Sequence, residues 1–318
     1  MNIKDFCKEN LSESQLRFLK QLYGDTRFAY RRIVPPELVL KKRFKERMGY
    51  TLNLDNPKTF NEKLQWLKLH DHNPLYTTMV DKYAVKKYVA DKIGEQYIIP
   101  TLGVWEHFDE IDFDKLPNQF VLKCTHDSGS IVVVTDKSKM DKVAAKEKLE
   151  NGLRYNYYYW GYEWPYKNVL PRIIAEKFMV ESKQNCTNLQ LASHGLIDYK
   201  FHCFNGYVDS VMLCLDRGTS DTKFYFFDRE WRLKRYNVRG QKAPENFTIP
   251  KPPNMEEMFS IAETLAEDFP FVRVDLYSIA GQTYFGELTF YPQSGFDSNL
   301  LRTTDEYWGD LIDLDGKI

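Results

Sequence analysis

Residues 271–291 read FVRVDLYSIAGQTYFGELTFY, and this stretch decides the fold class of the chain. Apolar and polar residues alternate on both sides of an Ala-Gly pair, which is typical of two antiparallel strands joined by a tight turn. Arg273 and Asp275 share one face of the first strand, and Glu287 and Thr289 share one face of the second. We therefore predict a β-hairpin with one apolar face and one charged face.

The charged face of this hairpin has the side chains of a metal and phosphate site. A loop with an odd number of residues centred on Gly281 would place Asp275 opposite Glu287 and Arg273 opposite Thr289. Two facing carboxylates repel each other unless a cation lies between them, and such oxygen ligands suit Mg²⁺ shared with phosphate. Arg273 can hold a phosphate or an acyl-phosphate beside them. Taken alone, the pattern favours a surface hairpin with ordinary salt bridges.

A second polar group lies at residues 120–135, where two predicted strands flank a short loop that contains a glycine. Lys123 lies near the end of the first strand, and the backbone of residues 127–130 can offer N–H groups to phosphates. Lys200 shares a strand face with His202 in a hairpin that turns at an Asn-Gly pair. The chain has no P-loop motif and no dinucleotide-binding glycine motif, so neither of those sites is supported.

The rest of the chain indicates an α+β fold, because the predicted strands occur in hairpins and the helices are grouped elsewhere. Helices are expected through the first hundred residues, including one over 80–93 that is followed by a short strand at 98–100. The later elements are a helix at 140–153, a strand at 172–179, a hairpin at 223–236 and a helix at 255–269.

Composition excludes several classes of protein. The 318 residues include 44 basic and 45 acidic ones, a balance that argues against a general binder of nucleic acid or anionic membranes. The basic run at 41–47 is most simply a solvated helix face, although it can also contact a polyanionic glycan or a membrane surface. No apolar run has the length of a membrane span and the first residues lack a signal-peptide core, so we expect a cytoplasmic protein. The five scattered cysteines are expected to be reduced.

Several of these segments together resemble the ATP-grasp superfamily, which includes D-alanine–D-alanine ligase. VDKYAVKKYVADKIG (80–94), YKNVLPRIIAEKF (166–178) and VRVDLYSIAGQTYFGELTFYPQSG (272–295) are most similar to TupA-like ATP-grasp proteins, which are found with bacterial surface-polysaccharide genes. The resemblance covers about residues 40 to 305. It implies two α+β lobes that grip ATP, a small lobe at 111–180 and a large lobe at 181–318. A helical N-terminal region at 1–110 would precede them.

The resemblance also implies roles for individual residues. Asp275, Glu287 and Thr289 would bind Mg²⁺, with Arg273 at the acyl-phosphate. Many members of the family have Asn where this chain has Thr289, which leaves the number of metal ions open. The residues implied for ATP are Lys82, Lys123, His126, Asp127, Ser128, Gly129, Ser130, Glu176, Lys177, Phe178 and Lys200. Ser294 and Gly295 are candidate contacts for the substrate.

The implied activity is that of an ATP-dependent carboxylate–amine ligase. ATP would convert a carboxylate to an acyl-phosphate, and an amine would displace phosphate to form an amide. By analogy with the gene family, the carboxylate is a uronic acid of a capsule or O-antigen and the amine is an amino acid. Enzymes of polysaccharide assembly are expected as partners, without nucleic acid and without stable membrane insertion.

Other interpretations stay open at this point. A sugar kinase would use the same scaffold with an attacking hydroxyl. A glycosyltransferase is suggested by the D-x-D spacings at 112–114 and 313–315, and a non-enzymatic carbohydrate-binding protein by the aromatic tract at 155–164. His70 and His72 lack a third ligand nearby, so a solvated loop is expected there instead of a metal site.

Overall fold

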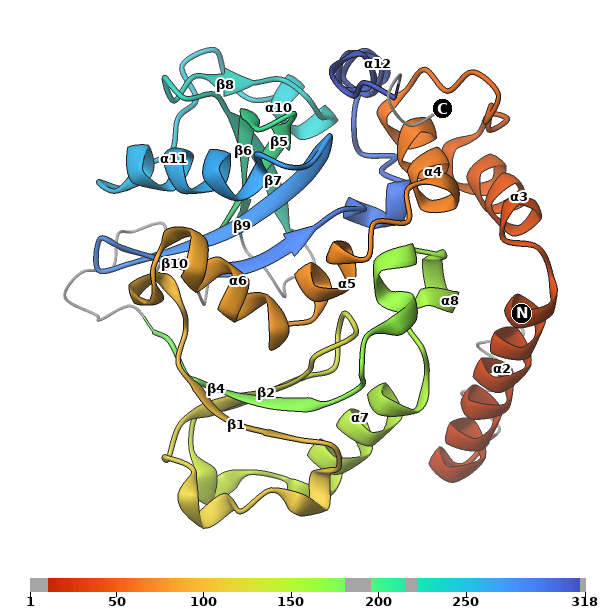
Figure 1. Cartoon of the computed structure of the whole chain (residues 1–318), viewed down its shortest axis with the longest axis vertical. Coiled ribbons are helices and arrows are strands. Elements are labelled where there is room, and N and C mark those ends of the chain that lie inside the picture. The colour runs from red at the N-terminus through yellow and green to blue at the C-terminus, as the bar shows by residue number, and fades with distance from the viewer. Residues whose placement is uncertain (1–10, 181–195, 216–221, 315–318) are drawn as a thin grey trace.

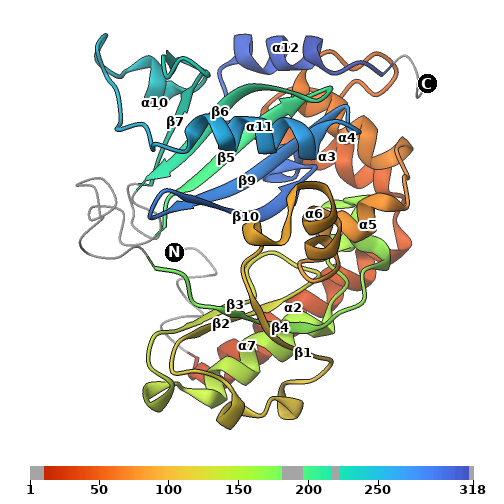
Figure 2. The ribbon, with the colours of Figure 1, turned by 60° about the vertical axis from the view of Figure 1, so that its left-hand side comes forward.

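Two antiparallel sheets form the framework of the protein (Figures 1 and 2). The computed structural model describes residues 11–180, 196–215 and 222–314. The small sheet has the order β1-β4-β2-β3, with β1 (Thr101–Trp105), β2 (Phe120–Cys124), β3 (Ile131–Val134) and β4 (Ile173–Lys177). The large sheet has the order β10-β9-β5-β6-β7-β8, with β5 (Asp198–Phe204), β6 (Tyr207–Leu215), β7 (Lys223–Phe227), β8 (Leu233–Lys234), β9 (Phe271–Ile279) and β10 (Gln282–Thr289).

Helices surround both sheets, and α5 and α6 lie between them (Figure 1). The N-terminal helices are α2 (Glu13–Ile33), α3 (Pro36–Met48), α4 (Phe60–His70), α5 (Leu75–Val80) and α6 (Ala84–Ile93). The later ones are α7 (Lys142–Arg154), α8 (Tyr158–Gly161), α10 (Val238–Gln241), α11 (Met255–Ala266) and α12 (Arg302–Leu311). Short 3₁₀ turns are η1 (Glu95–Tyr97), η2 (Phe108–Glu110), η3 (Phe113–Lys115), η4 (Lys137–Lys139), η5 (Trp164–Asn168) and η6 (Pro292–Gly295).

Each sheet buries one face against a helix and thereby leaves the other face for polar residues. In the small sheet, Phe120 and Leu122 pack with Leu149 of α7. In the large sheet, Phe201 contacts Phe259 of α11, with ring centroids 5.2 Å apart. Because side chains alternate along a strand, the neighbours of these apolar residues point away from α7 and α11. The helices α4, α5 and α6 contribute to the same core as the large sheet.

The pairing of β9 with β10 has the predicted register, but it arises in a different way. The turn has two residues, so Ile279 pairs with Gln282, and the register then shifts by one residue between Phe285 and Glu287. This β-bulge places Asp275 opposite Glu287 and also Arg273 opposite Thr289. The predicted odd-numbered loop is therefore wrong, and the extra residue is Gly286.

Other predicted boundaries also differ. The strand expected at 98–100 begins instead at Thr101, because residues 95–97 form a 3₁₀ turn and Pro100 has no N–H to donate. The helix expected over 80–93 begins only at Ala84, because Val80 ends α5 and the Asp81 carboxylate then accepts from the N–H groups of Tyr83 and Ala84 at the start of α6. The second strand of the hairpin at 223–236 is only two residues long.

Two general expectations can also be compared with the structure. Cys124, Cys203 and Cys214 are buried thiols and not members of disulfides, while Cys7 and Cys186 lie outside the described residues. Within residues 11–180, 196–215 and 222–314, none of the helices combines the length and the apolar character that crossing a bilayer requires.

The close packing at the bulge predicts that Gly286→Ala destabilises the protein. A Cβ at this position would lie 2.9 Å from the Asp275 carbonyl oxygen and 3.0 Å from a ring carbon of Tyr277. We expect the substitution to lower the free energy of unfolding by about 1–3 kcal/mol, measured by urea denaturation. Gly24→Ala is the control, since its Cβ meets only the Tyr155 hydroxyl at an ordinary 3.5 Å within a helix. Equal stability of Gly286→Ala and wild type would contradict the steric role of Gly286.

Candidate functional site

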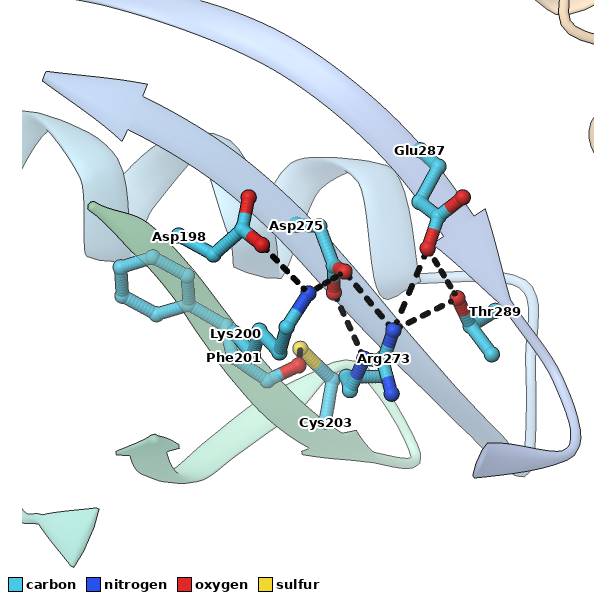
Figure 3. Close-up of polar contacts among 8 residues, drawn as sticks. All are labelled: Asp198, Lys200, Phe201, Cys203, Arg273, Asp275, Glu287 and Thr289. Carbon is cyan, nitrogen blue, oxygen red and sulfur yellow. Dashed lines mark hydrogen bonds and ion pairs between the residues drawn. The ribbon is translucent and has the colours of Figure 1, made fainter. Parts of the chain in front are cut away.

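Arg273 connects the polar residues of β9 and β10 (Figure 3). Its Nε donates to Oδ1 of Asp275 at 2.6 Å, and its Nη2 donates to Oδ2 of the same carboxylate at 2.7 Å. The same Nη2 donates to the Thr289 hydroxyl at 3.0 Å and to the Glu287 carboxylate at 3.3 Å. A single guanidinium therefore bridges the two facing carboxylates and stands where the sequence predicted a cation.

The adjacent strand β5 adds a lysine and a third carboxylate to this group. Lys200 pairs in register with Asp275 and forms an ion pair with it, and Lys200 Nζ lies 3.4 Å from the Asp198 carboxylate. We call these residues the large-sheet cluster: Asp198, Lys200, Arg273, Asp275, Glu287 and Thr289. Sequence analysis missed Asp198, although its spacing of two residues from Lys200 places both on one face of a strand.

The electrostatics of the large-sheet cluster keep Asp275 ionised. Burial by itself would raise the pKa of Asp275, but Arg273 and Lys200 lower it to about 2. Burial lowers the pKa of His202 to about 3, and Arg273 adds to the shift, so this imidazole is neutral. It stacks on Trp308 of α12. The Asp275 side chain is 3% exposed and that of Glu287 is 48% exposed, so the cluster opens to solvent at Glu287.

The donor atoms of this cluster fit a magnesium ion. Asp275, Glu287 and Thr289 offer two carboxylates and a hydroxyl, which are the hard oxygen ligands that Mg²⁺ prefers. In the described part of the chain, no group of three His, Cys, Asp or Glu side chains gathers to hold a metal. Mg²⁺ typically takes one or two carboxylates and completes its shell with water and substrate phosphates, so two carboxylates are sufficient.

A second charged group lies on the small sheet around Glu176. One carboxylate oxygen of Glu176 is 2.6 Å from Lys123 Nζ, and the other is 2.5 Å from Lys86 Nζ. Burial would raise the pKa of Glu176, but the two lysines more than offset this effect and lower it. Sequence analysis missed Lys86, although it follows Lys82 by four residues in a stretch predicted to be helical.

The glycine-containing loop after β2 is held close to this group. Lys82 donates its side chain to the Asp127 carbonyl and its N–H to the Thr125 carbonyl. The Ser130 hydroxyl donates to the Asp127 carboxylate, and Gly129 has a φ of +113°, a conformation that glycine adopts readily. We call Lys82, Lys86, Lys123, Asp127 and Glu176 the small-sheet cluster.

Three predicted residues lie apart from these contacts. His126 is buried and turned toward α7, with Nε2 3.2 Å from the Gly152 carbonyl oxygen, and burial lowers its pKa. Lys177 is exposed and Phe178 is half-buried at the point where the chain leaves β4. Within the residues that the structure describes, none of these three side chains forms a hydrogen bond or ion pair with either cluster, although the charges of Asp127 and Lys82 act on His126.

The Tyr157 hydroxyl is affected by charged side chains of the loop and of the large-sheet cluster. Burial raises the pKa of its hydroxyl, and the charges of Glu163, Asp127 and Glu287 add to the shift. Its hydroxyl also forms a hydrogen bond with Ser128. The charges of Asp127 in the loop and of Glu287 on β10 therefore both act on this one hydroxyl. Other aromatic residues of the same tract pack on α2, where Tyr155 and Tyr159 contact Phe28.

Ser294 and Gly295 follow the large-sheet cluster in a strained loop. Gln293, Ser294 and Gly295 all have φ between 49° and 62°, which is rare for three consecutive residues. Lys68 of α4 donates to the Ser294 carbonyl at 2.7 Å and to its hydroxyl at 3.0 Å, and Gln65 donates to the Gly295 carbonyl at 2.5 Å. Two side chains of α4 therefore hold the loop at 293–295 in place.

Lys68 and Glu163 are both buried, and both contact Ser294. Burial lowers the pKa of Lys68 to about 7, an effect that the Glu163 carboxylate opposes. Burial raises the pKa of Glu163, an effect that Lys68 opposes. Each group therefore depends on the other to keep its charge inside the protein.

Three alternative motifs can be compared with the structure in part, because Asp315 of the D-x-D motif at 313–315 lies outside the described residues. The Asp112 carboxylate accepts from the Asp114 N–H at 3.1 Å and pairs with Lys115 at the surface, as in an ordinary helix cap. His70 packs on Trp66, and His72 stacks on Trp164. The D-x-D spacing at 112–114 thus has a structural role in the cap.

A double-mutant cycle can measure the interaction between Lys68 and Glu163. Lys68→Met leaves Glu163 without its compensating charge, so we expect the free energy of unfolding to fall by about 3 kcal/mol. Adding Glu163→Gln should restore part of that loss, because the second change removes the uncompensated charge. Urea denaturation of the wild type, both single variants and the double variant measures the coupling. Strictly additive losses would show that the two side chains do not interact.

The chain is similar to proteins of one known family. The sequence model of the TupA-like ATPgrasp family matches residues 62–313. No curated protein matches the chain significantly. Among solved structures, the chain is similar to the ATP-grasp ligase PsnB complexed with minimal precursor, Mg and ADP, at 8% identity and a TM-score of 0.38 over 72% of this chain and 57% of PsnB.

Two D-alanine–D-alanine ligases are also similar. The Bacillus anthracis enzyme complexed with ATP has 15% identity and a TM-score of 0.40, over 74% of this chain and 63% of that one. The Helicobacter pylori enzyme has 13% identity and a TM-score of 0.40, over 80% and 67%. The match thus spans less than two thirds of PsnB and of the Bacillus anthracis enzyme. Because the family model covers most of the sequence, the chain belongs to the TupA-like ATP-grasp family and has the α+β ATP-grasp fold that its sequence predicted.

Proposed function

We propose that the protein is an ATP-dependent carboxylate–amine ligase that uses Mg²⁺ and forms an amide. The observation that carries this proposal is the bridge that Arg273 makes between Asp275 and Glu287, opposite a glycine-containing loop. Bound MgATP would supply the phosphoryl group that activates a carboxylate as an acyl-phosphate, from which an amine displaces phosphate. Such transfer depends on positioning and charge neutralisation, and it needs no nucleophilic side chain of the protein.

The opposite charges of the two clusters support this assignment. The large-sheet cluster has three carboxylates and two cationic side chains, so its net charge of −1 favours a metal cation. The small-sheet cluster has three lysines and two carboxylates, so its net charge of +1 favours phosphates. A nucleotide with its metal between the clusters would therefore meet complementary charge on both sides.

Individual residues would then act through the contacts that they already make. Lys82 and the backbone of residues 127–130 would hold phosphates, as would Lys123, which is 24% exposed. Asp275, Glu287 and Thr289 would hold the metal. Arg273 is fixed by two hydrogen bonds to Asp275, so its charge would stay in one place beside the reacting phosphoryl group. Lys200 would add a second fixed positive charge.

The substrates that we propose are a uronic acid of a bacterial surface polysaccharide and an amino acid. The support is the family to which the chain belongs, together with the position of the strained loop at 293–295 immediately after the metal-binding strand. The Ser294 hydroxyl already contacts Lys68 and the Gly295 carbonyl already accepts from Gln65, so a substrate that binds this loop would replace one of these contacts. The reaction would take place in the cytoplasm, where ATP is available, near enzymes of polysaccharide assembly.

An assay of products tests this function. With MgATP, a panel of uronic acids and their oligomers, and a panel of amino acids, we expect equal amounts of ADP and free phosphate, and an amide product by mass spectrometry. Both substrates should be required for turnover. Lys123→Met should lower kcat/KM by roughly a hundredfold, because a charge close to the phosphates is lost.

Lys87→Met is the matched control for Lys123→Met. The Lys87 side chain is 83% exposed on α6 and pairs with the exposed Asp91, so its removal should leave kcat/KM unchanged. A phosphorylated sugar formed with ADP and without free phosphate would instead identify a kinase and overturn the ligase assignment.

A further inference from the structure

The helices α2 and α3 carry exposed apolar and basic side chains that the proposed reaction does not use. Leu19, Leu22, Tyr23, Tyr30 and Ile33 are all exposed on α2, and Ile33 is 82% exposed. At 100° per residue these five positions fall within an arc of about 100° on one side of the helix. We call them the apolar stripe.

The opposite side of α2 is anchored to the protein, so the apolar stripe faces away from it. Phe28 packs on Tyr155 and Tyr159, with ring centroids 5.4 and 5.0 Å away. Arg31 is buried and donates to the carbonyls of Tyr159 and Trp160 at 2.8 Å. In Figure 1, α2 runs along the edge of the molecule, away from the large sheet.

The next helix presents basic side chains in the same way. Leu38, Lys41, Lys42 and Lys45 are all exposed on α3, and their spacing places them within an arc of about 100°. Lys41 pairs with Glu37 at 2.6 Å, and both of these side chains are themselves exposed. We call the three lysines the basic stripe; it follows the apolar stripe directly in the chain.

Charge is concentrated in these two helices. Residues 13–48 contain ten basic and four acidic residues and thus carry +6. The whole chain carries −1, so the rest of it carries −7. The near-neutral total therefore conceals a strongly basic segment at one edge of the molecule.

We propose that the apolar and basic stripes of α2 and α3 bind the surface of an anionic lipid membrane. An interfacial helix has an apolar face with aromatic residues and nearby Lys or Arg, which is the combination found here. A second copy of the chain is a poorer occupant, because a symmetric dimer would bring two segments of +6 together. The protein would lie on the membrane without crossing it, whatever reaction it catalyses.

Vesicle flotation with the full chain tests this proposal. We expect binding to vesicles of phosphatidylcholine mixed with phosphatidylglycerol, little binding to phosphatidylcholine alone, and a decrease as salt is raised. Changing Lys41, Lys42 and Lys45 together to Glu should weaken binding by roughly a hundredfold or more, since each lysine near an anionic surface contributes about fivefold. Tyr30→Ser with Ile33→Ser should also weaken it strongly.

Two control variants match these changes elsewhere on the surface. Val143→Ser removes a side chain on α7 that is 79% exposed, and Lys115→Glu with Lys139→Glu reverses two lysine side chains that are 85% and 82% exposed. Both controls should bind like the wild type. The thermal midpoint of each variant, which should not change, confirms that the fold is intact.

Three results would overturn the proposal. The first is no binding to anionic vesicles. The second is binding that the stripe variants and the controls lower equally. The third is a dimer, seen by light scattering, that Ile33→Ser dissociates, because the apolar stripe would then be an interface between two copies of the chain.

Discussion

The β-bulge at Gly286 determines which side chains meet on the polar face of the large sheet. Without the extra residue, the register at the turn would pair Asp275 with residue 286, and Glu287 with Val274. Glu287 would then point toward the apolar core under α11, since a slip of one residue reverses every side chain of a strand. The bulge therefore brings the two carboxylates together, and the close approach of the Asp275 carbonyl restricts position 286 to glycine. Arg273 then joins Asp275, Glu287 and Thr289 in one hydrogen-bonded group.

Both charged clusters are already paired internally. Asp275 is held by Arg273 and Lys200, and Glu176 is held by Lys86 and Lys123. These pairs keep buried charges compensated while each cluster retains a small net charge. Ligand binding would therefore exchange some of these contacts for contacts with phosphate and metal. The Tyr157 hydroxyl is affected by the charges of both Asp127 and Glu287, one from each cluster.

Local patterns predicted much of the fold from the sequence, because alternation and turn residues act over short distances. The β9–β10 hairpin, the loop after β2 and the facing of Asp275 with Glu287 were all predicted correctly. The bulge was not predicted, since a longer loop and a bulge produce the same pairing of Asp275 with Glu287. Local patterns also cannot predict which distant segments come into contact. Lys68 and Ser294, for example, are 226 residues apart in the chain. Lys86 was missed because its partner Glu176 lies on β4, far along the chain, whereas Asp198 was missed although its partner Lys200 lies on the same strand.

The most direct test of this account is a thermal-shift measurement with ATP, in the presence of Mg²⁺ or of EDTA, on the wild type, Glu287→Gln and Glu306→Gln. Glu306 is a matched control, because it is half-exposed on α12 and pairs with Arg302, which is also half-exposed. The account predicts that MgATP raises the melting temperature of the wild type and of Glu306→Gln, since a ligand that binds only the folded state stabilises it. The rise should be smaller in EDTA and lost in Glu287→Gln. An equal rise for Glu287→Gln and wild type, or no rise for either, would contradict the assignment of the large-sheet cluster as the nucleotide and metal site.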